Sequence, residues 1–90
     1  MIYVLIPSYN DSRNFSKLLS NLNFIITSKK KIFIIDDGST DNTKEIIKKL
    51  SEKFPVTRIG YGQNKGPGYA FKFGFNYLMP KLQSDDLVIT

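Results

Sequence analysis

Residues 32–35 constrain the fold of this chain more than any other stretch. They read Ile-Phe-Ile-Ile, an uninterrupted run of β-branched and aromatic residues that is typical of a strand buried on both faces of a parallel sheet. The run leads directly into Asp36-Asp37-Gly38-Ser39, which marks the point where the strand leaves the core. Because ligands of open α/β sheets bind at the carboxyl ends of the strands, we expect Asp36 and Asp37 to stand beside a ligand site.

Further apolar runs predict three more strands, at 2–6, 56–61 and 87–90. Pro7 marks the end of the first strand, since proline cannot donate to a β-ladder. Helices are expected between successive strands, so the predicted order is β-α-β-α-β-α-β. Short connections in this order imply right-handed crossovers and a mostly parallel sheet. The expected fold class is α/β, with a Rossmann-like arrangement.

The first two helices are predicted from caps and from helical periodicity. Asp11 or Ser12 can cap the first helix, and Asn42 with Glu45 resembles a capping box for the second, which Pro55 ends. Apolar residues at helical spacing predict the buried faces. These residues are Phe15, Leu18, Leu19, Leu22, Ile25 and Ile26 in the first helix, and Ile46, Ile47, Leu50 and Phe54 in the second.

The third connection, residues 68–79, is ambiguous in its pattern. Its aromatic residues alternate along the sequence, which favours a strand, whereas Pro67 and Pro80 frame a length typical of a helix. The residues of the opposite phase, Ala70, Lys72, Gly74 and Asn76, fit neither pattern cleanly. We predict a helix because of the two prolines that frame it.

Composition excludes several kinds of site within these residues. The chain has no cysteine and no histidine, so it can hold neither a disulfide, nor a thiolate or imidazole metal site, nor a catalytic histidine. The apolar run at the amino terminus lacks a basic region before it and is too short for a signal peptide or a membrane span. A cytoplasmic location, including the cytoplasmic face of a membrane, is the default expectation.

The net charge of +5 has two interpretations. One is a solvated, lysine-rich surface; the other is attraction to an anionic partner, such as a phosphorylated metabolite, a nucleic acid or an acidic membrane face. The local concentrations are Lys29-Lys30-Lys31 and the lysines at positions 44, 48, 49 and 53. We do not expect nucleic-acid binding, because these lysines are not interleaved with exposed aromatic residues on one face.

Three strand ends carry residues suited to ligand binding, and in a parallel sheet they emerge at one edge. They are Pro7-Ser8-Tyr9-Asn10, Asp36-Asp37-Gly38-Ser39 and the loop Asn64-Lys65-Gly66-Pro67-Gly68. The acidic pair is equally readable as helix capping or as a site that meets a base edge or a metal. The glycine loop either provides a turn or faces a phosphate with its backbone N–H groups. Asp85-Asp86 precede a strand, so we expect them at the opposite edge.

Taken together, these three motifs resemble the family 2 glycosyltransferases of the GT-A fold. The resemblance covers nearly the whole chain, and the third motif is similar to the branch of dolichyl- and polyprenyl-phosphate sugar synthases. It implies inverting transfer of a sugar from a UDP- or GDP-linked donor, assisted by Mg²⁺ or Mn²⁺. The acceptor would be a polyprenyl phosphate or a glycan, in cell-wall or polysaccharide biosynthesis.

The resemblance also implies residue roles. Pro7 and Tyr9 would line the base and ribose pocket, with Tyr9 supplying an aromatic face. Asp37 would accept a hydrogen bond from the base ring N–H, with Asp36 as a secondary candidate. Three residues of the third motif would lie near the nucleotide: Asn64, Lys65 and Gly68.

No catalytic or metal-binding residue is assigned within residues 1–90. The metal-binding Asp-x-Asp of the family follows the fourth strand and is expected just beyond Thr90, so we interpret the chain as the nucleotide-binding part of a larger domain, inert by itself. The alternative is a small, non-catalytic α/β module that binds a nucleotide or a protein.

Overall fold

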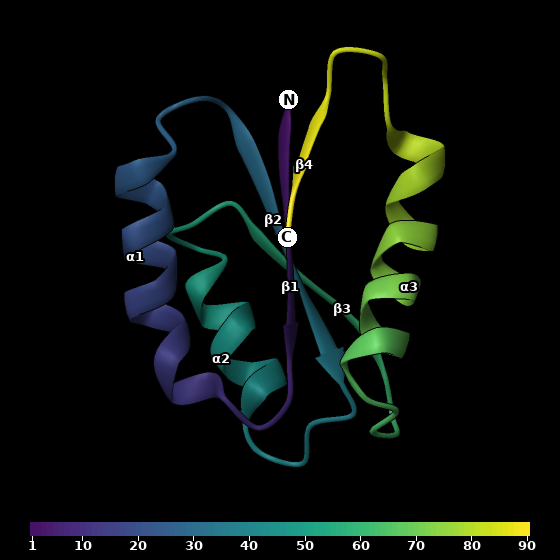
Figure 1. Ribbon diagram of the computed structural model, residues 1–90. Coiled ribbons are helices and arrows are strands. Elements are labelled where there is room, and N and C mark those ends of the chain that lie inside the picture. Colours follow the sequence, from purple (N-terminus) through teal and green to yellow (C-terminus); the bar gives the residue numbers. More distant parts are fainter.

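The computed structural model describes all 90 residues and contains one sheet of four parallel strands. Its spatial order is β3-β2-β1-β4, with the first strand of the chain in an interior position (Figure 1). The strands are β1 (Ile2–Ser8), β2 (Lys30–Asp37), β3 (Val56–Tyr61) and β4 (Leu87–Ile89). The predicted α/β class, the element order and the parallel pairing are confirmed.

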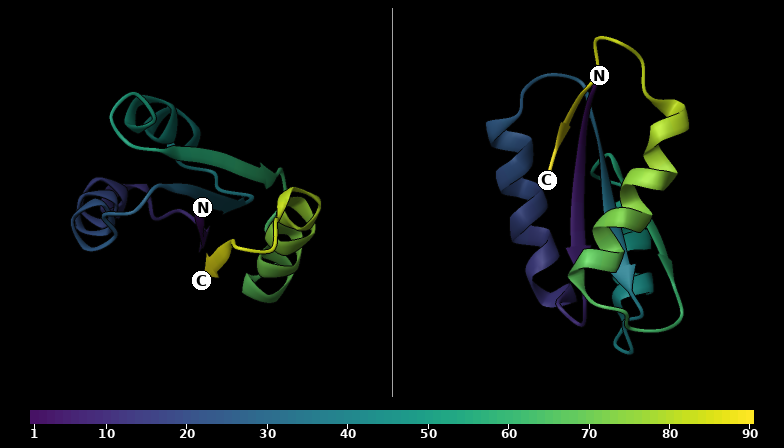
Figure 2. Two further views of the ribbon diagram at one scale, coloured as in Figure 1. Left: turned by 90° about the horizontal axis from the view of Figure 1, so that it is seen from above. Right: turned by 45° about the vertical axis from the view of Figure 1, so that its right-hand side comes forward.

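Three α-helices connect the strands and cover both faces of the sheet. They are α1 (Phe15–Ile25), α2 (Thr43–Leu50) and α3 (Pro67–Leu78), with short 3₁₀ turns at Ser12–Asn14 and Met79–Lys81. Seen along the strands, α1 and α2 lie on one side of the sheet and α3 lies on the other (Figure 2). The chain changes sides after β3, and β4 then pairs with the free side of β1.

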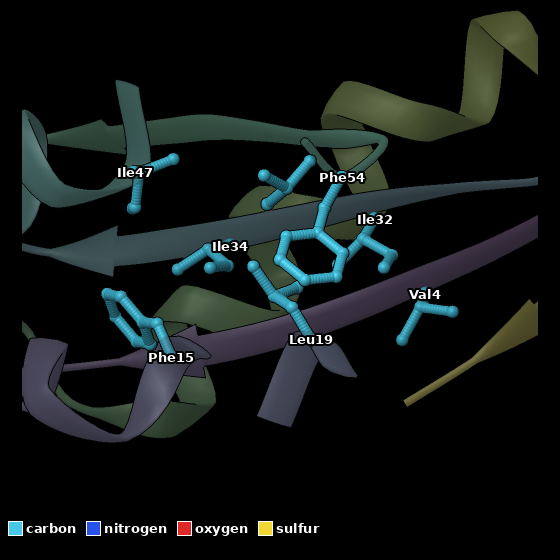
Figure 3. Packing of buried hydrophobic residues seen from close by; sticks show 8 residues of the cluster. Val4, Phe15, Leu19, Ile32, Ile34, Ile47 and Phe54 are labelled. Atoms are coloured by element: carbon cyan, nitrogen blue, oxygen red, sulfur yellow. The ribbon is translucent and has the colours of Figure 1, made fainter. Parts of the chain in front are cut away.

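Two separate hydrophobic clusters result from the alternation of side chains along the strands. The cluster beneath α1 and α2, shown in Figure 3, consists of Val4, Phe15, Leu19, Ile32, Ile34, Ile47, Phe54 and Val56. The cluster beneath α3 consists of Tyr3, Leu5, Phe33, Ile35, Ile59, Ala70 and Leu78. The run at 32–35 therefore contributes alternate residues to both clusters, as expected of a strand buried on both faces.

Helix α3 confirms the helical interpretation of the alternating aromatic segment. Ala70, Gly74 and Leu78 form its buried stripe at a spacing of four residues. A Cβ at Gly74 would lie 2.5 Å from Cδ1 of Ile35, so a larger residue would require the buried Ile35 side chain to move. The aromatic residues flank this stripe; Tyr77, for example, packs edge-on against Phe33 with ring centroids 5.5 Å apart.

The first two strands are longer than predicted. β1 continues through Pro7 to Ser8, so the prediction that Pro7 ends the strand is wrong. From Leu5 onward β1 pairs only with β2, because β4 faces just Ile2, Tyr3 and Val4, and a strand that is open on one side tolerates a residue without an N–H. β2 extends from the predicted 32–35 to Lys30–Asp37, since its backbone ladder does not depend on apolar side chains.

Two expectations for the helices also need correction. Ile25 is 73% exposed and not part of the buried face, because α1 ends at this residue and the backbone of Ile26 is already extended. None of the predicted caps makes a side-chain capping hydrogen bond. The side chains of Ser12 and Asn42 instead bond to each other, and Asp41 accepts the Thr43 N–H at the start of α2.

No helix of the structure combines the length and the apolar character needed to cross a membrane.

Candidate functional site

The two adjacent carboxylates lie on opposite faces of the sheet. Strand alternation continues through the end of β2, so Asp36 follows Ile34 to the α1/α2 side and Asp37 follows Ile35 to the α3 side. Both side chains are buried, with exposed fractions of 3% and 4%. They consequently have different partners and do not form a single acidic pair.

The Asp37 carboxylate binds the last residue of β3 and the loop between β3 and α3. Its Oδ1 accepts hydrogen bonds from the Tyr61 hydroxyl at 2.6 Å and the Lys65 N–H at 2.9 Å. Its Oδ2 accepts from the Asn64 side-chain amide and the Gly66 N–H, both at 2.9 Å. A carboxylate offers about four lone-pair positions, so these donors satisfy it completely.

These contacts determine the ionisation of both partners in the Asp37–Tyr61 pair. Burial by itself would raise the pKa of the Asp37 carboxyl, but the hydrogen bonds from Tyr61, Lys65 and Gly66 together hold that pKa below its ordinary value. Burial, with the hydrogen bond to Asp37, raises the pKa of the Tyr61 hydroxyl. Asp37 is therefore a stable carboxylate and Tyr61 a stable hydrogen-bond donor at neutral pH.

Gly38 allows the loop between β3 and α3 to close over the end of β2. Its φ is +71°, and a Cβ there would collide with the backbone of Gln63 and Asn64. Glycine avoids both the clash and the left-handed strain. The Asn64 amide also donates to the Asp37 carbonyl oxygen at 3.1 Å, so the backbone and the side chain of Asp37 both hold this loop.

On the other face, Asp36 joins strand β3 to the loop that follows β2. Its Oδ2 accepts from the Arg58 Nε at 2.9 Å, and its Oδ1 accepts from the Ser39 N–H at 2.9 Å. The Arg58 side chain is 26% exposed, so this ion pair is reached by water.

The loop after β1 is bound to the loop after β2 by a second set of polar contacts. The Asn10 side-chain oxygen accepts the Thr40 N–H at 2.8 Å, and the Asn10 N–H donates to the Ser39 hydroxyl at 3.0 Å. Asn10 adopts a φ of +51°, a conformation that asparagine tolerates better than most residues. The Ser12 hydroxyl contacts Asp41 at 3.1 Å. The Asn10 and Ser12 side chains thus hold two strand ends in a fixed relation.

An open pocket of about 140 Å³ lies between the end of β1 and the start of α3. Its lining residues are Pro7, Ser8, Tyr9, Asp37, Pro67 and Ala70. Tyr9 is 48% exposed, so its ring is free to contact a ligand. The Ser8 hydroxyl is buried without a hydrogen-bond partner. The volume is below the roughly 300–1,000 Å³ of complete small-molecule sites, so the pocket accommodates one part of a ligand.

The structure brings together some of the predicted site residues and separates others. Pro7, Tyr9 and Asp37 share the pocket, whereas Asp36 lies on the opposite face. Asn64 and Lys65 contact Asp37 through the Asn64 amide and the Lys65 N–H, and the Lys65 ammonium lies 5.0 Å from the centre of the Tyr69 ring.

The glycine loop contains both features that its sequence left open. Gly66 has a φ of +91° and provides a turn, and the N–H groups of Lys65 and Gly66 do bind an anion, which is the Asp37 carboxylate. Gly68 is exposed in the first turn of α3, with no heavy atom within 4 Å of a Cβ placed on it.

Tyr61, Arg58, Asn10, Ser12 and Gly38 are contributors that the sequence interpretation did not assign. Part of the signal was present: Tyr61 and Asp37 are paired in register, and strand alternation places their side chains on the same face. No periodic pattern in the sequence predicts that the loop between β3 and α3 packs against Gly38.

The acidic residues of the chain do not form a metal site. No group of three potential ligands is close enough to hold an ion. Asp36 and Asp37 point to opposite faces, and each oxygen of both already accepts a protein donor. As for Asp85-Asp86, they precede β4 at the opposite edge as expected, where Asp86 lies 3.2 Å from the amino-terminal ammonium.

Comparison with known proteins relates residues 3–81 to the family described as Glycosyl transferase family 2. A poly-beta-1,6-N-acetyl-D-glucosamine synthase of Staphylococcus aureus (strain COL) is 35% identical over 92 residues, which cover 97% of this chain and 22% of the synthase. A glycosyltransferase of Nostoc sp. described as uncharacterised is 37% identical over 75 residues, or 82% of this chain and 23% of that protein. The chain spans less than a quarter of the length of these curated relatives.

Solved structures share the fold. The mannosyltransferase PcManGT from Pyrobaculum calidifontis, in complex with GDP-Man and Mn²⁺, matches 84% of this chain and 24% of its own, with a TM-score of 0.73 and 20% identity. S. aureus TarS 1-349, in complex with UDP-GlcNAc, matches 97% of this chain and 25% of its own, with a TM-score of 0.66 and 24% identity. At these identities the similarity establishes the architecture.

Proposed function

Because the chain belongs to glycosyl transferase family 2, we propose that its 90 residues bind the nucleotide of a nucleoside diphosphate sugar during glycosyl transfer. One observation carries this proposal: three polar strand ends meet at one edge of the sheet, and two of them, with α3, line the pocket that holds Tyr9 and Asp37. That edge is where open α/β folds bind nucleotides. The donor would be linked to UDP or GDP.

The proposed contacts divide between stacking and hydrogen bonding. Tyr9 would stack on the base, Pro7 would form the wall of the pocket, and Asp37 would accept the base ring N–H. Since Asp37 already has four donors, a base N–H must replace one of them. The Tyr61 hydroxyl and the Asn64 amide are the side-chain donors, and they can move without altering the backbone of the loop.

The remaining steps require groups that these residues do not supply. We propose that transfer is inverting and metal-assisted, with Mg²⁺ or Mn²⁺ held by an Asp-x-Asp outside residues 1–90, where the base that activates the acceptor would also lie. A metal stabilises the charge of a diphosphate leaving group, and a general base removes the proton of an acceptor hydroxyl. The acceptor would be a glycan or a polyprenyl phosphate. The chain alone should therefore show no turnover with nucleotide sugar, metal and acceptor.

Calorimetric titration of the chain with UDP and with GDP tests the binding proposal. We expect one nucleotide to bind and Tyr9→Ser to weaken it by roughly tenfold through lost stacking. Phe24→Ser is a matched control, because Phe24 is 86% exposed at the other edge of the sheet. Equal affinity of the Tyr9→Ser variant and the wild-type chain would contradict the proposal.

Asp37 is tested separately because it also holds the loop. Asp37→Asn should lose nucleotide binding, while Asp36→Asn, on the opposite face, should retain it. Hydrogen exchange at the Lys65 amide shows whether the loop is still closed in each variant. If an Asp37→Asn chain with a closed loop binds nucleotide normally, Asp37 does not contact the base.

The second candidate function is a non-catalytic binding module. It is favoured by the complete hydrogen bonding of Asp37 and by the ion pair of Asp36 with Arg58 in the free chain, which give both carboxylates a structural role. Failure of UDP and GDP to bind would support this candidate.

A further inference from the structure

The entire net charge of the chain lies on helix α1 and its flanking segments. Residues 12–35 contain five basic residues and no acidic one: Arg13, Lys17, Lys29, Lys30 and Lys31. The rest of the chain has eight basic and eight acidic residues and is therefore neutral. The charge of +5 is thus a property of one region and not of a uniformly basic surface.

The most exposed large apolar residues occur in the same region. Phe24 is 86% exposed and Ile25 is 73% exposed, more than any other large hydrophobic side chain. They occupy the last turn of α1, immediately before the loop that leads to Lys29-Lys30-Lys31. Adjacent apolar side chains that a fold leaves in water commonly mark an interaction surface.

The structure places positive charge beside these apolar side chains. The Lys30 ammonium donates to the Ile26 carbonyl oxygen at 2.9 Å, which fixes it at the end of α1 next to Ile25. Lys29 is exposed in the loop just before it, whereas Lys31 is directed to the α3 side of the sheet with Tyr3 and Phe33. The outward residues of α1 that precede Phe24 are uncharged or basic: Ser16, Lys17, Ser20, Asn21 and Asn23. We call Phe24, Ile25, Lys29 and Lys30 the α1 tip.

We propose that the α1 tip docks on an anionic lipid bilayer. An aromatic and an aliphatic side chain can enter the boundary between headgroups and acyl chains, while lysines beside them bind lipid phosphates. Stable attachment requires both an apolar and an electrostatic contribution, and the tip supplies the two together. Ile25 provides no stacking surface for a base, which favours lipid over nucleic acid as the polyanion.

The position of the α1 tip is compatible with the chain being bound to a membrane while its pocket holds a nucleotide. It lies at the amino edge of the sheet, whereas the pocket lies at the carboxyl edge, at the other end of a molecule whose longest extent is 36 Å (Figure 1). A docked chain would keep its nucleotide pocket open to water. The inference does not depend on nucleotide binding, so the two proposals can fail independently.

Cosedimentation with vesicles tests the proposal without any nucleotide. We expect the chain to bind vesicles of phosphatidylcholine with phosphatidylglycerol, and to bind phosphatidylcholine vesicles far more weakly. Replacing Lys29 and Lys30 by Gln should reduce the partition coefficient by roughly 30-fold. The matched control replaces Lys48 and Lys49 by Gln, which removes the same charge from α2 and should change binding much less.

A second variant tests the apolar contribution. Phe24→Asn with Ile25→Asn should weaken vesicle binding by about tenfold or more at constant charge. Met79→Asn, at a residue 63% exposed elsewhere on the surface, is the control. Circular dichroism confirms that each variant is folded.

Three outcomes would overturn the proposal. One is no binding to anionic vesicles. Another is that both lysine variants weaken binding equally. The last concerns Phe24→Asn with Ile25→Asn. If this variant leaves vesicle binding unchanged, the tip binds polyanions through charge alone; if it instead abolishes a dimer detected by sedimentation, the tip is a self-association surface.

Discussion

Asp36 and Asp37 are neighbours in sequence but belong to different structures. Asp37, on the α3 side, accepts one hydrogen bond from the last residue of β3 and three from the loop that follows β3. Asp36, on the α1/α2 side, accepts one bond from β3 and one from the loop after β2. The end of β2 therefore positions two different segments: the loop between β3 and α3 through Asp37, and the loop after β2 through Asp36. Identical side chains at adjacent positions differ in role because a strand directs them to opposite faces.

The largest expected difference between the two faces is in stability. Asp37→Ala leaves the N–H groups of Lys65 and Gly66 without their acceptor, so we expect a loss of about 3 kcal/mol or more in the free energy of unfolding. Urea unfolding measures this loss. Hydrogen exchange should show faster exchange at both amides, and unchanged exchange there would contradict the assigned role.

Gly38→Ala should be next in size. Its Cβ would meet the backbone of Gln63 and Asn64 at a φ of +71°, so we expect a cost of about 2 kcal/mol or more in unfolding free energy. Gly62→Ala is the control, because Gly62 has neither a positive φ nor an atom near the added Cβ, and it should cost little. Equal costs would show that the close approach at Gly38 is unimportant.

Asp36→Ala should destabilise the chain less than Asp37→Ala, by about 1–2 kcal/mol. The reason is that Arg58 is partly exposed and water can replace its lost partner. Urea unfolding of the two alanine variants side by side checks the order. A larger loss for Asp36→Ala would reverse the comparison between the two faces.

Tyr61→Phe removes one of the four donors to Asp37 and should cost about 1 kcal/mol. Tyr69→Phe, whose hydroxyl makes no hydrogen bond in the structure, is the control and should cost little. Both values come from urea unfolding. An equal effect of the two changes would show that the Tyr61 hydroxyl contributes nothing to the loop.

The smallest expected effect is a dependence on pH. The pKa of Asp37 is lower in the folded chain than its unfolded value of about 3.9, so the stability it adds is present above that pH and is lost as the pH falls through the folded pKa. A titration of the Lys65 and Gly66 amide chemical shifts should give a midpoint below about 3.9. A midpoint above that value would contradict the hydrogen-bonded carboxylate.

The elements were largely predictable because their residues follow simple periods. The run at 32–35 indicated a buried strand, Pro67 and Pro80 correctly indicated a helix between them, and β3 was located at its observed bounds. Sequence reasoning was less successful at the ends of elements, where Pro7 lies inside β1 and Ile25 lies on the surface. There, backbone pairing and helix termination determine the outcome, and neither depends on hydropathy alone.

The candidate site was predictable in position but not in connectivity. Parallel topology was sufficient to place Tyr9 and Asp37 at one edge. Extending the alternation of 32–35 by two residues would have separated Asp36 from Asp37. The contacts of Asp37 with the Lys65 and Gly66 N–H groups were not accessible in this way, because they depend on the path of an aperiodic loop.

The pairing of β4 with β1 has a consequence for the order of folding. Ile2 pairs with Leu87, so this contact joins segments far apart in the sequence, whereas β1, β2 and β3 pair with one another within residues 2–61. Contacts between distant segments require the largest loop closures and form slowly. We therefore expect the fourth strand to be the last of these four to join the sheet.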